Sequence, residues 1–211
     1  HIARMWPVAG VVGENGAFTF SYNRKARHMS RTYLIPEAER LEGRRRLERI
    51  RERVLREVPR CAIASDQSFR VADLAIDYRE DAGPLSDEEI EAVCRIIESE
   101  GANYKVSSIH INCWYGSFDK VSGVRRFLGE RGRDLDRPEV QGSALFIGDS
   151  PNDEPLFQAL AASIAVANIR PYLPKLKHPP AYITEREAAA GFAEAVSVIL
   201  AKRGGASGTR G

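Results

Sequence analysis

Two aspartates that lie four residues apart could hold a metal ion. Asp149 and Asp153 belong to the segment GDSPND (148–153), so a short loop can bring both carboxylates toward one point. Carboxylate oxygens are preferred ligands of hard cations such as Mg²⁺. A local role is the alternative, with Asp149 as a helix cap and Asp153 as a favourable charge in the first turn. An EF-hand calcium loop fits less well, because Glu154 occupies the position of its invariant Gly.

The elements around this pair are those of an open α/β sheet. An apolar run at 144–147 precedes the aspartates and predicts a buried strand. The Pro, Asn and acidic residues that follow, with a new apolar pattern at 156–160, predict a sharp loop and the start of a helix. Ligands of such sheets bind at the carboxyl ends of the strands. The sequence therefore predicts a metal–phosphate site at this loop.

A lysine at the start of another predicted helix has the charge to complete this site. Lys120 precedes an apolar stripe formed by Val124, Phe127 and Leu128. The helix dipole disfavours a positive charge at this end, so the placement of the lysine indicates a function. In phosphoryl transfer, negative charge spreads over the phosphate oxygens, and a fixed ammonium offsets it.

Three segments resemble motifs of the haloacid dehalogenase (HAD) superfamily of phosphatases. GDSPND resembles its last signature motif, and SFDKVSGV (117–124) resembles its lysine motif. VVGENGA (11–17), which alone predicts a hairpin with an Asn-Gly turn, is similar to the NGA turn of subclass IIB. Members of this subclass carry an α/β cap and include Cof-type sugar phosphatases, sucrose-phosphate phosphatase and mannosyl-3-phosphoglycerate phosphatase. Asn168 matches an Asn that often follows the next strand in these proteins.

The resemblance implies an α/β fold in two parts. A Rossmann-like core with a parallel sheet would comprise residues 1–21 and 116–203, without its first strand and helix. An α/β cap would be inserted at 22–115. The Gly-rich residues 204–211 would form a disordered tail.

The resemblance also implies roles for the motif residues. HAD phosphatases hydrolyse phosphate esters through an aspartyl-phosphate, which divides one hard displacement into two easier ones. The catalytic residues would be Lys120, Asp149 and Asp153, and the last two would bind Mg²⁺. Support for the phosphate and the loops would come from Ser150, Asn152, Asn15 and Asn168.

One expected motif does not occur in these residues. Relatives carry an Asp-x-Asp loop near the amino terminus, and its first Asp is the nucleophile. The only Asp-x-Asp triplet here, at 134–136, follows no apolar strand. The chain also starts at His1, inside a predicted helix–strand unit. We therefore expect the nucleophile upstream of His1, and expect this chain alone to be inactive.

The predicted cap sheet has one apolar and one polar face. Strands predicted at 69–78 and 106–115 alternate apolar and polar residues. Amphipathic helices predicted at 36–58 and 87–99 would cover the apolar face. The polar face could then cover a substrate or be an ordinary solvent face. The side chains expected to face the substrate are Asp77, Arg79, His110, Asn112 and Trp114.

Composition argues against several classes of protein. The 211 residues contain 31 Lys and Arg against 29 Asp and Glu, a balance that does not favour nucleic-acid binding. No apolar run approaches the roughly 20 residues of a membrane helix. Three cysteines without CxxC spacing predict a reduced, cytoplasmic compartment.

The sequence as a whole predicts a Mg²⁺-dependent phosphatase. Its partner would be a small phosphorylated metabolite, with a sugar phosphate as the expected ester. A phosphomutase is an alternative within the same chemistry. A noncatalytic protein that binds phosphate or metal on the same scaffold is an alternative of a different class. The sequence predicts no oligomeric state.

Overall fold

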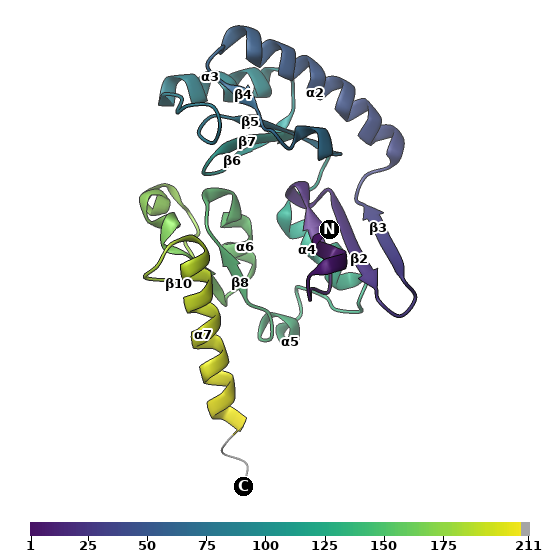
Figure 1. The fold of residues 1–211 in the computed structure, drawn as a ribbon, viewed down its shortest axis with the longest axis vertical. Coiled ribbons are helices and arrows are strands. Elements are labelled where there is room, and N and C mark those ends of the chain that lie inside the picture. The colour runs from purple at the N-terminus through teal and green to yellow at the C-terminus, as the bar shows by residue number, and fades with distance from the viewer. Residues whose placement is uncertain (208–211) are drawn as a thin grey trace. The chain divides into compact units, whose positions relative to one another are not determined.

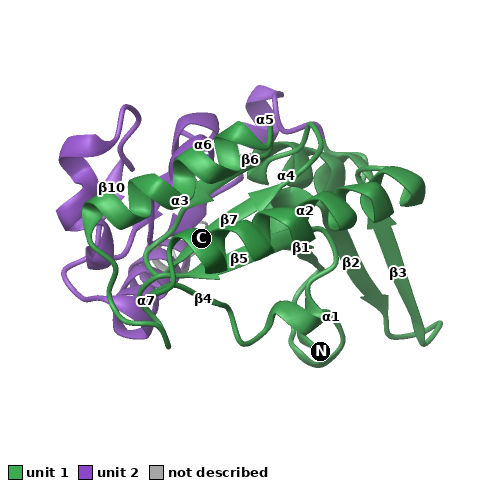
Figure 2. Cartoon of the chain, turned by 90° about the horizontal axis from the view of Figure 1, so that it is seen from above, with its two compact units in different colours: residues 1–133 green, residues 134–211 purple. Residues whose placement is uncertain are grey.

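The computed structural model describes residues 1–207 of the chain (Figure 1). The chain divides into two compact units, residues 1–133 and residues 134–211 (Figure 2). The predicted core is thus shared between the two units, whereas the predicted cap lies wholly within the first. Every helix in the described part of the chain is too short or too polar to cross a bilayer.

The first unit begins with an antiparallel sheet of three strands. A short helix, α1 (Ile2–Met5), precedes it, as the sequence predicts. The predicted start of the cap, at Tyr22, falls inside the second strand, whose hairpin continues the sheet to Tyr33. Residues 22–33 of the predicted cap thus belong to the same sheet as β1. The strands are, in order, β1 (Val11–Gly13), β2 (Phe18–Asn23) and β3 (His28–Tyr33), and the 3₁₀ turn η1 (Glu14–Gly16) joins the first two.

A second antiparallel sheet of the first unit has the strand order β4-β5-β7-β6. The predicted strand at 106–115 is wrong in its first part, because the backbone reverses between Ser107 and His110. The Ser107 N–H donates to the His110 carbonyl at 2.8 Å, which closes a hairpin. The four strands are β4 (Ala62–Ile63), β5 (Asp73–Asp77), β6 (Asn103–Val106) and β7 (His110–Trp114).

Two helices pack on one face of this sheet (Figure 1). They are α2 (Glu37–Glu57) and α3 (Asp87–Ser99), and both match the predicted ranges. α3 begins with the predicted capping box, in which the Ser86 hydroxyl accepts from the Glu89 N–H and the Glu89 carboxylate accepts from the Ser86 N–H. The buried contact is apolar on both sides. It contains Leu47, Ile50, Val54, Leu74, Ile76, Val93, Ile97, Ile111 and Cys113.

The first unit ends with α4 (Lys120–Gly129), which packs against β1, β2 and η1. Asp119 caps this helix through a reciprocal pair with Ser122. The Asp119 carboxylate accepts from the Ser122 N–H at 2.7 Å, and the Ser122 hydroxyl accepts from the Asp119 N–H at 2.8 Å. The predicted helix start at Lys120 is confirmed.

The second unit contains a parallel sheet with the order β10-β9-β8. Phe157, Ala165 and Ile169 form its core, against which Phe146 packs. The last helix continues to Ser207, beyond the predicted end of ordered structure at residue 203. The glycines at 204 and 205 each cost a helix only about 1 kcal/mol, so they do not have to end it. The rest of the predicted tail, 208–211, lies outside the described residues. The elements are α5 (Pro138–Gln141), β8 (Phe146–Gly148), the 3₁₀ turn η3 (Pro151–Asp153), α6 (Glu154–Ala159), β9 (Ser163–Ala165), the 3₁₀ segment η4 (Ala167–Lys175), β10 (Tyr182–Ile183) and α7 (Ala188–Ser207).

Candidate metal–phosphate site

The loop after β8 is built around the Asp153 side chain. Asp153 is 5% exposed, and its Oδ2 atom accepts hydrogen bonds from the N–H groups of Asp149 at 2.9 Å and Ser150 at 3.3 Å. A Cβ atom at Gly148 would lie 2.6 Å from that oxygen, so this residue must be Gly. Asp149 is exposed at the carboxyl end of β8. Asp153 therefore fixes the loop from which Asp149 projects.

The remaining polar residues of the loop hold one another. The Ser150 hydroxyl is buried and donates to the Asn152 Oδ1 atom at 2.7 Å. Glu154, at the start of α6, accepts from the N–H groups of Lys177 and His178 at 2.6 and 2.8 Å. Sequence reasoning missed this role of Glu154, because its partners lie more than twenty residues away.

Asn168 anchors the last helix of the same unit. Its Oδ1 atom accepts from the Ala188 N–H at 2.7 Å. Ala188 has a φ of 47°, a left-handed conformation that L-residues rarely adopt. The hydrogen bond from the Ala188 N–H to Asn168 thus stabilises an uncommon backbone at the start of α7.

Lys120 lies in the first unit, where its helix start contacts the η1 turn. Lys120 is half-buried. A Cβ atom at Gly123 would lie 2.6 Å from the Gly16 Cα, and one at Gly16 would clash with the Asp119 carbonyl. Glycine at both positions lets the two backbones touch. The lysine segment and the NGA turn, distant in sequence, are therefore neighbours.

The η1 turn is strained and is held by the loop before β5. Glu14 and Asn15 have φ values of 44° and 54°, which is uncommon for residues other than Gly. The Glu14 carboxylate accepts from the N–H groups of Val71, Ala72 and Asp73 at 2.6 to 3.1 Å. These bonds offset the cost of the left-handed backbone.

Asn15 contacts a buried carboxylate that the sequence did not single out for function. Its Nδ2 atom donates to the Asp73 Oδ2 at 3.2 Å, and Arg70 Nη1 lies 3.1 Å from Asp73 Oδ1. Burial raises the pKa of Asp73 to about 6, Arg70 acts in the opposite sense, and Glu14 adds to the increase. Asn15 thus reaches Asp73 at the start of β5 and, through it, the four-stranded sheet.

The five cap residues expected to face the substrate have different surroundings. Asp77 is buried and accepts from four backbone N–H groups at 79–82. Burial alone would raise its pKa, but these four bonds together lower it. Trp114 Nε1 donates to the Phe118 carbonyl at 3.1 Å, and its ring stacks on Phe118. Both residues therefore have structural partners.

The other three residues are placed differently. Asn112 Oδ1 accepts from Arg70 Nη1 at 3.4 Å. His110 Nε2 lies 2.9 Å from a Glu80 carboxylate oxygen, which forms an ion pair when the imidazole is protonated. Arg79 is exposed.

The carboxylate oxygens of Asp149 and Asp153 suit Mg²⁺, which prefers oxygen ligands and keeps several bound waters. Within residues 1–207, no three His, Cys, Asp or Glu side chains form a ready metal cluster. A site at Asp149 and Asp153 would therefore leave its other coordination positions to water and substrate.

No protein-family model matches the chain, and no curated protein matches it at a significant level. Solved structures do match its fold. SMU.1108c of Streptococcus mutans has a TM-score of 0.62 and 14% identity over 91% of this chain and 77% of that one. The sucrose-phosphatase of Synechocystis, solved with sucrose and phosphate, has a TM-score of 0.56 and 12% identity, over 87% and 70% of the two chains.

A third similar structure is that of BT4131, a sugar phosphatase of HAD subclass IIB. Its TM-score is 0.57 and its identity 13%, over 91% of this chain and 76% of that one. Similarity at such low identity defines the fold, and it agrees with the parallel and antiparallel sheets seen here. The chain therefore has the fold of the HAD superfamily phosphatases of subclass IIB.

Proposed function

We propose that the chain is part of a Mg²⁺-dependent phosphatase that hydrolyses a small phosphate ester, with a sugar phosphate as the expected substrate. The loop after β8 carries the proposal, because it joins an exposed Asp149 to a buried Asp153 at the carboxyl end of a parallel strand. The fold supports it, since the similar structures include a sucrose-phosphatase and a sugar phosphatase.

Asp149 and Asp153 are the proposed Mg²⁺ ligands, and Asp153 would act directly or through a water. Bound Mg²⁺ supplies charge neutralisation and alignment of the ester for in-line attack. The two hydrogen bonds to Asp153 Oδ2 hold the backbone at Asp149 and Ser150, which would help to orient Asp149 toward the ion. Ser150 and Asn152 support this loop through their mutual hydrogen bond.

Lys120 is the proposed catalytic cation, which would offset charge on the phosphoryl oxygens. The Asp119–Ser122 capping pair fixes the helix start from which its side chain extends. Asn15 supports the turn beside that helix start, and Asn168 fixes the start of α7. Both asparagines would thus act by positioning rather than by contact with phosphate.

The nucleophile is proposed to precede His1 in a longer polypeptide. The Asp-x-Asp triplet at 134–136 lies outside the strands, and Asp134 is exposed beside Arg137. In the described residues, β1 and β8 are each the terminal strand of a sheet. A further strand could therefore pair with either of them.

A phosphatase assay of the polypeptide extended upstream of His1 tests this proposal. We expect it to release phosphate from sugar phosphates with Mg²⁺ and not with a chelator. Asp149→Asn and Lys120→Met should each lower kcat by about 10²-fold or more, since each removes charge stabilisation from the transition state. Asp134→Asn is the matched control, because it neutralises an exposed carboxylate outside the loop.

Three results would contradict the proposed site or the proposed activity. Hydrolysis that survives Asp149→Asn unchanged would exclude this loop as the site. Binding of Mg²⁺ and phosphate without turnover in the extended polypeptide would favour the noncatalytic alternative. Transfer of phosphate within a sugar, without release, would identify a phosphomutase.

A further inference from the structure

The polar face of the cap sheet contains one cation that the sequence prediction did not name. The strand register places Lys105 of β6 opposite Asn112 of β7. Because side chains alternate along a strand, Lys105 shares a face with the residues expected to meet the substrate. Sequence reasoning missed it because β6 was not predicted as a separate strand.

Most neighbours of Lys105 on that face have partners of their own. Asp77 is bound by four backbone N–H groups, and Asn112 accepts from Arg70. Asn103, on the same strand, donates to the Gly116 carbonyl at 2.9 Å. The Lys105 side chain is exposed, and within the described residues it makes no hydrogen bond or ion pair. On strands β6 and β7, Lys105 is therefore a charged group that is available to a ligand.

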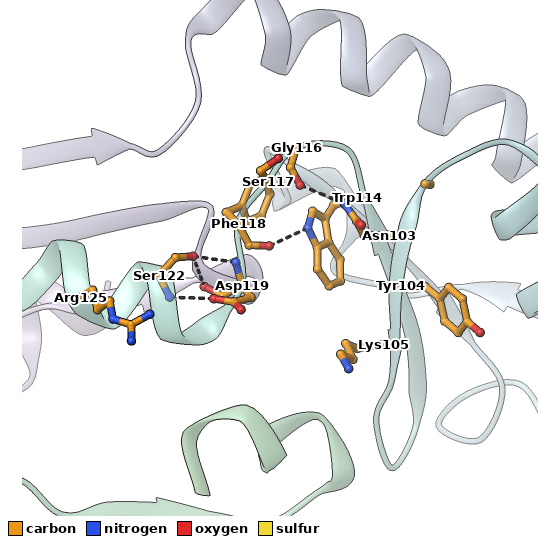
Figure 3. A pocket seen from close by; sticks show the side chains of 11 residues that line it. Asn103, Tyr104, Lys105, Trp114, Gly116, Ser117, Phe118, Asp119, Ser122 and Arg125 are labelled. Carbon is orange, nitrogen blue, oxygen red and sulfur yellow. Dashed lines mark hydrogen bonds between the residues drawn. The ribbon is translucent and has the colours of Figure 1, made fainter. Parts of the chain in front are cut away.

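Lys105 also lines a pocket of about 620 Å³ (Figure 3). Trp114 and Lys105 lie on one side of this pocket, and the start of α4, with Ser122 and Arg125, lies on the other. Among the described residues that line it, Asp119 is the one carboxylate, and it already accepts from the Ser122 N–H. The pocket thus combines the aromatic ring of Trp114 with the exposed ammonium of Lys105, which suits an anionic group.

We propose that Lys105 binds a second acidic group of the substrate, distinct from the phosphoryl group that is removed. This inference rests on the proposed phosphatase function and narrows its substrate class to phosphate esters with a further carboxylate or phosphate. An ammonium forms a charge-assisted hydrogen bond with either group. Lys105 would thus determine specificity, not catalyse the reaction.

Matched pairs of esters test the role of Lys105 in the extended polypeptide. 3-Phosphoglycerate and glycerol 3-phosphate differ only in a carboxylate against a hydroxymethyl group. Fructose 1,6-bisphosphate and fructose 6-phosphate differ only in a second phosphate. We expect the wild-type protein to prefer the acidic member of at least one pair by roughly tenfold or more in kcat/KM, and the pair concerned identifies the group.

The variant Lys105→Met keeps the length of the side chain and removes its charge. It should lose this preference and keep kcat/KM for the neutral member. Lys25→Met, on the loop between β2 and β3, is the control for loss of a surface charge and should keep the preference. Two results would overturn this inference and leave the proposed phosphatase function intact. One is a Lys105→Met variant that keeps the preference. The other is a wild-type protein with equal kcat/KM for both members of each pair. Absence of phosphate release from all four esters and from the sugar phosphates of the assay above would overturn the proposed function as well.

Discussion

Asp73 is a carboxylate for which burial outweighs a neighbouring arginine. It is 3% exposed, and its pKa is raised from 3.8 to about 6. When folding raises the pKa of an acid, the protonated acid favours the folded state. This contribution to the free energy of unfolding is fully present below the pKa of the unfolded chain, and it is lost as the pH rises through the pKa of the folded protein. The loss between about pH 4 and pH 6 corresponds to roughly 3 kcal/mol.

The variant Asp73→Asn should therefore become relatively more stable as the pH rises. We expect its free energy of unfolding, compared with that of the wild type, to improve by up to about 3 kcal/mol between pH 4 and pH 7. The substitution also removes the contact with Arg70, which changes the free energy of unfolding by an amount that does not depend on pH. Urea unfolding at several pH values measures the difference. Asp66→Asn is the control, since it removes an exposed partner of the same arginine. A difference that stays constant with pH would contradict the raised pKa.

Residues with local signals could be identified from the sequence. Asp149 and Asp153 could be identified because they lie four residues apart in one loop, and Lys120 could be identified because it is the first residue of a helix. The functions of Glu14 and Arg70 were not visible. Glu14 binds N–H groups 57 to 59 residues away, and Arg70 reaches Asn112 across 42 residues. Contacts over such separations depend on the tertiary fold, which local patterns do not report.

Among the elements, α4 depends on close contact between two backbones. Gly123 faces Gly16 and Val12, and an added Cβ would lie 2.6 and 2.7 Å from their nearest atoms. Gly129 lies at the end of the same helix and has open space around it. The two glycines therefore form a matched pair for testing this contact.

Gly123→Ala should destabilise the protein by about 1 to 3 kcal/mol, because the helix must move away from the turn. Gly129→Ala should be neutral or slightly stabilising, since alanine favours the helix and meets no neighbour. Thermal unfolding of both variants measures the effect. Equal effects of the two substitutions would show that α4 does not touch the turn.

The hairpin of β6 and β7 shows what the strand prediction overlooked. Apolar residues fall on even positions at Tyr104 and Val106 and on odd positions at Ile109 and Ile111. This change of phase marks the turn at 107–108, which contains neither Gly nor Pro. The α3 helix, by contrast, was predicted to the residue, because Ser86 and Glu89 form a capping box at its start.

For the whole molecule, the order of the motifs predicted the fold, whereas the predicted cap boundary at Tyr22 falls inside a strand. GDSPND, the lysine segment and the NGA turn together indicated the HAD fold, which the similar solved structures confirm. The hairpin of β2 and β3 was assigned in part to the cap, because its two strands contain no signal for the sheet they join. The pairing of β1 with β2, which places Val11 opposite Phe20, shows that they extend the β1 sheet.

The central claim is that the loop after β8 binds Mg²⁺ through Asp149 with support from Asp153. Calorimetric titration of the folded protein with Mg²⁺ tests it without requiring turnover. We expect binding in the wild type, weaker binding in Asp153→Asn, unchanged binding in Asp134→Asn and no detectable binding in Asp149→Asn. Wild-type affinity for Mg²⁺ in a folded Asp149→Asn variant would contradict the claim.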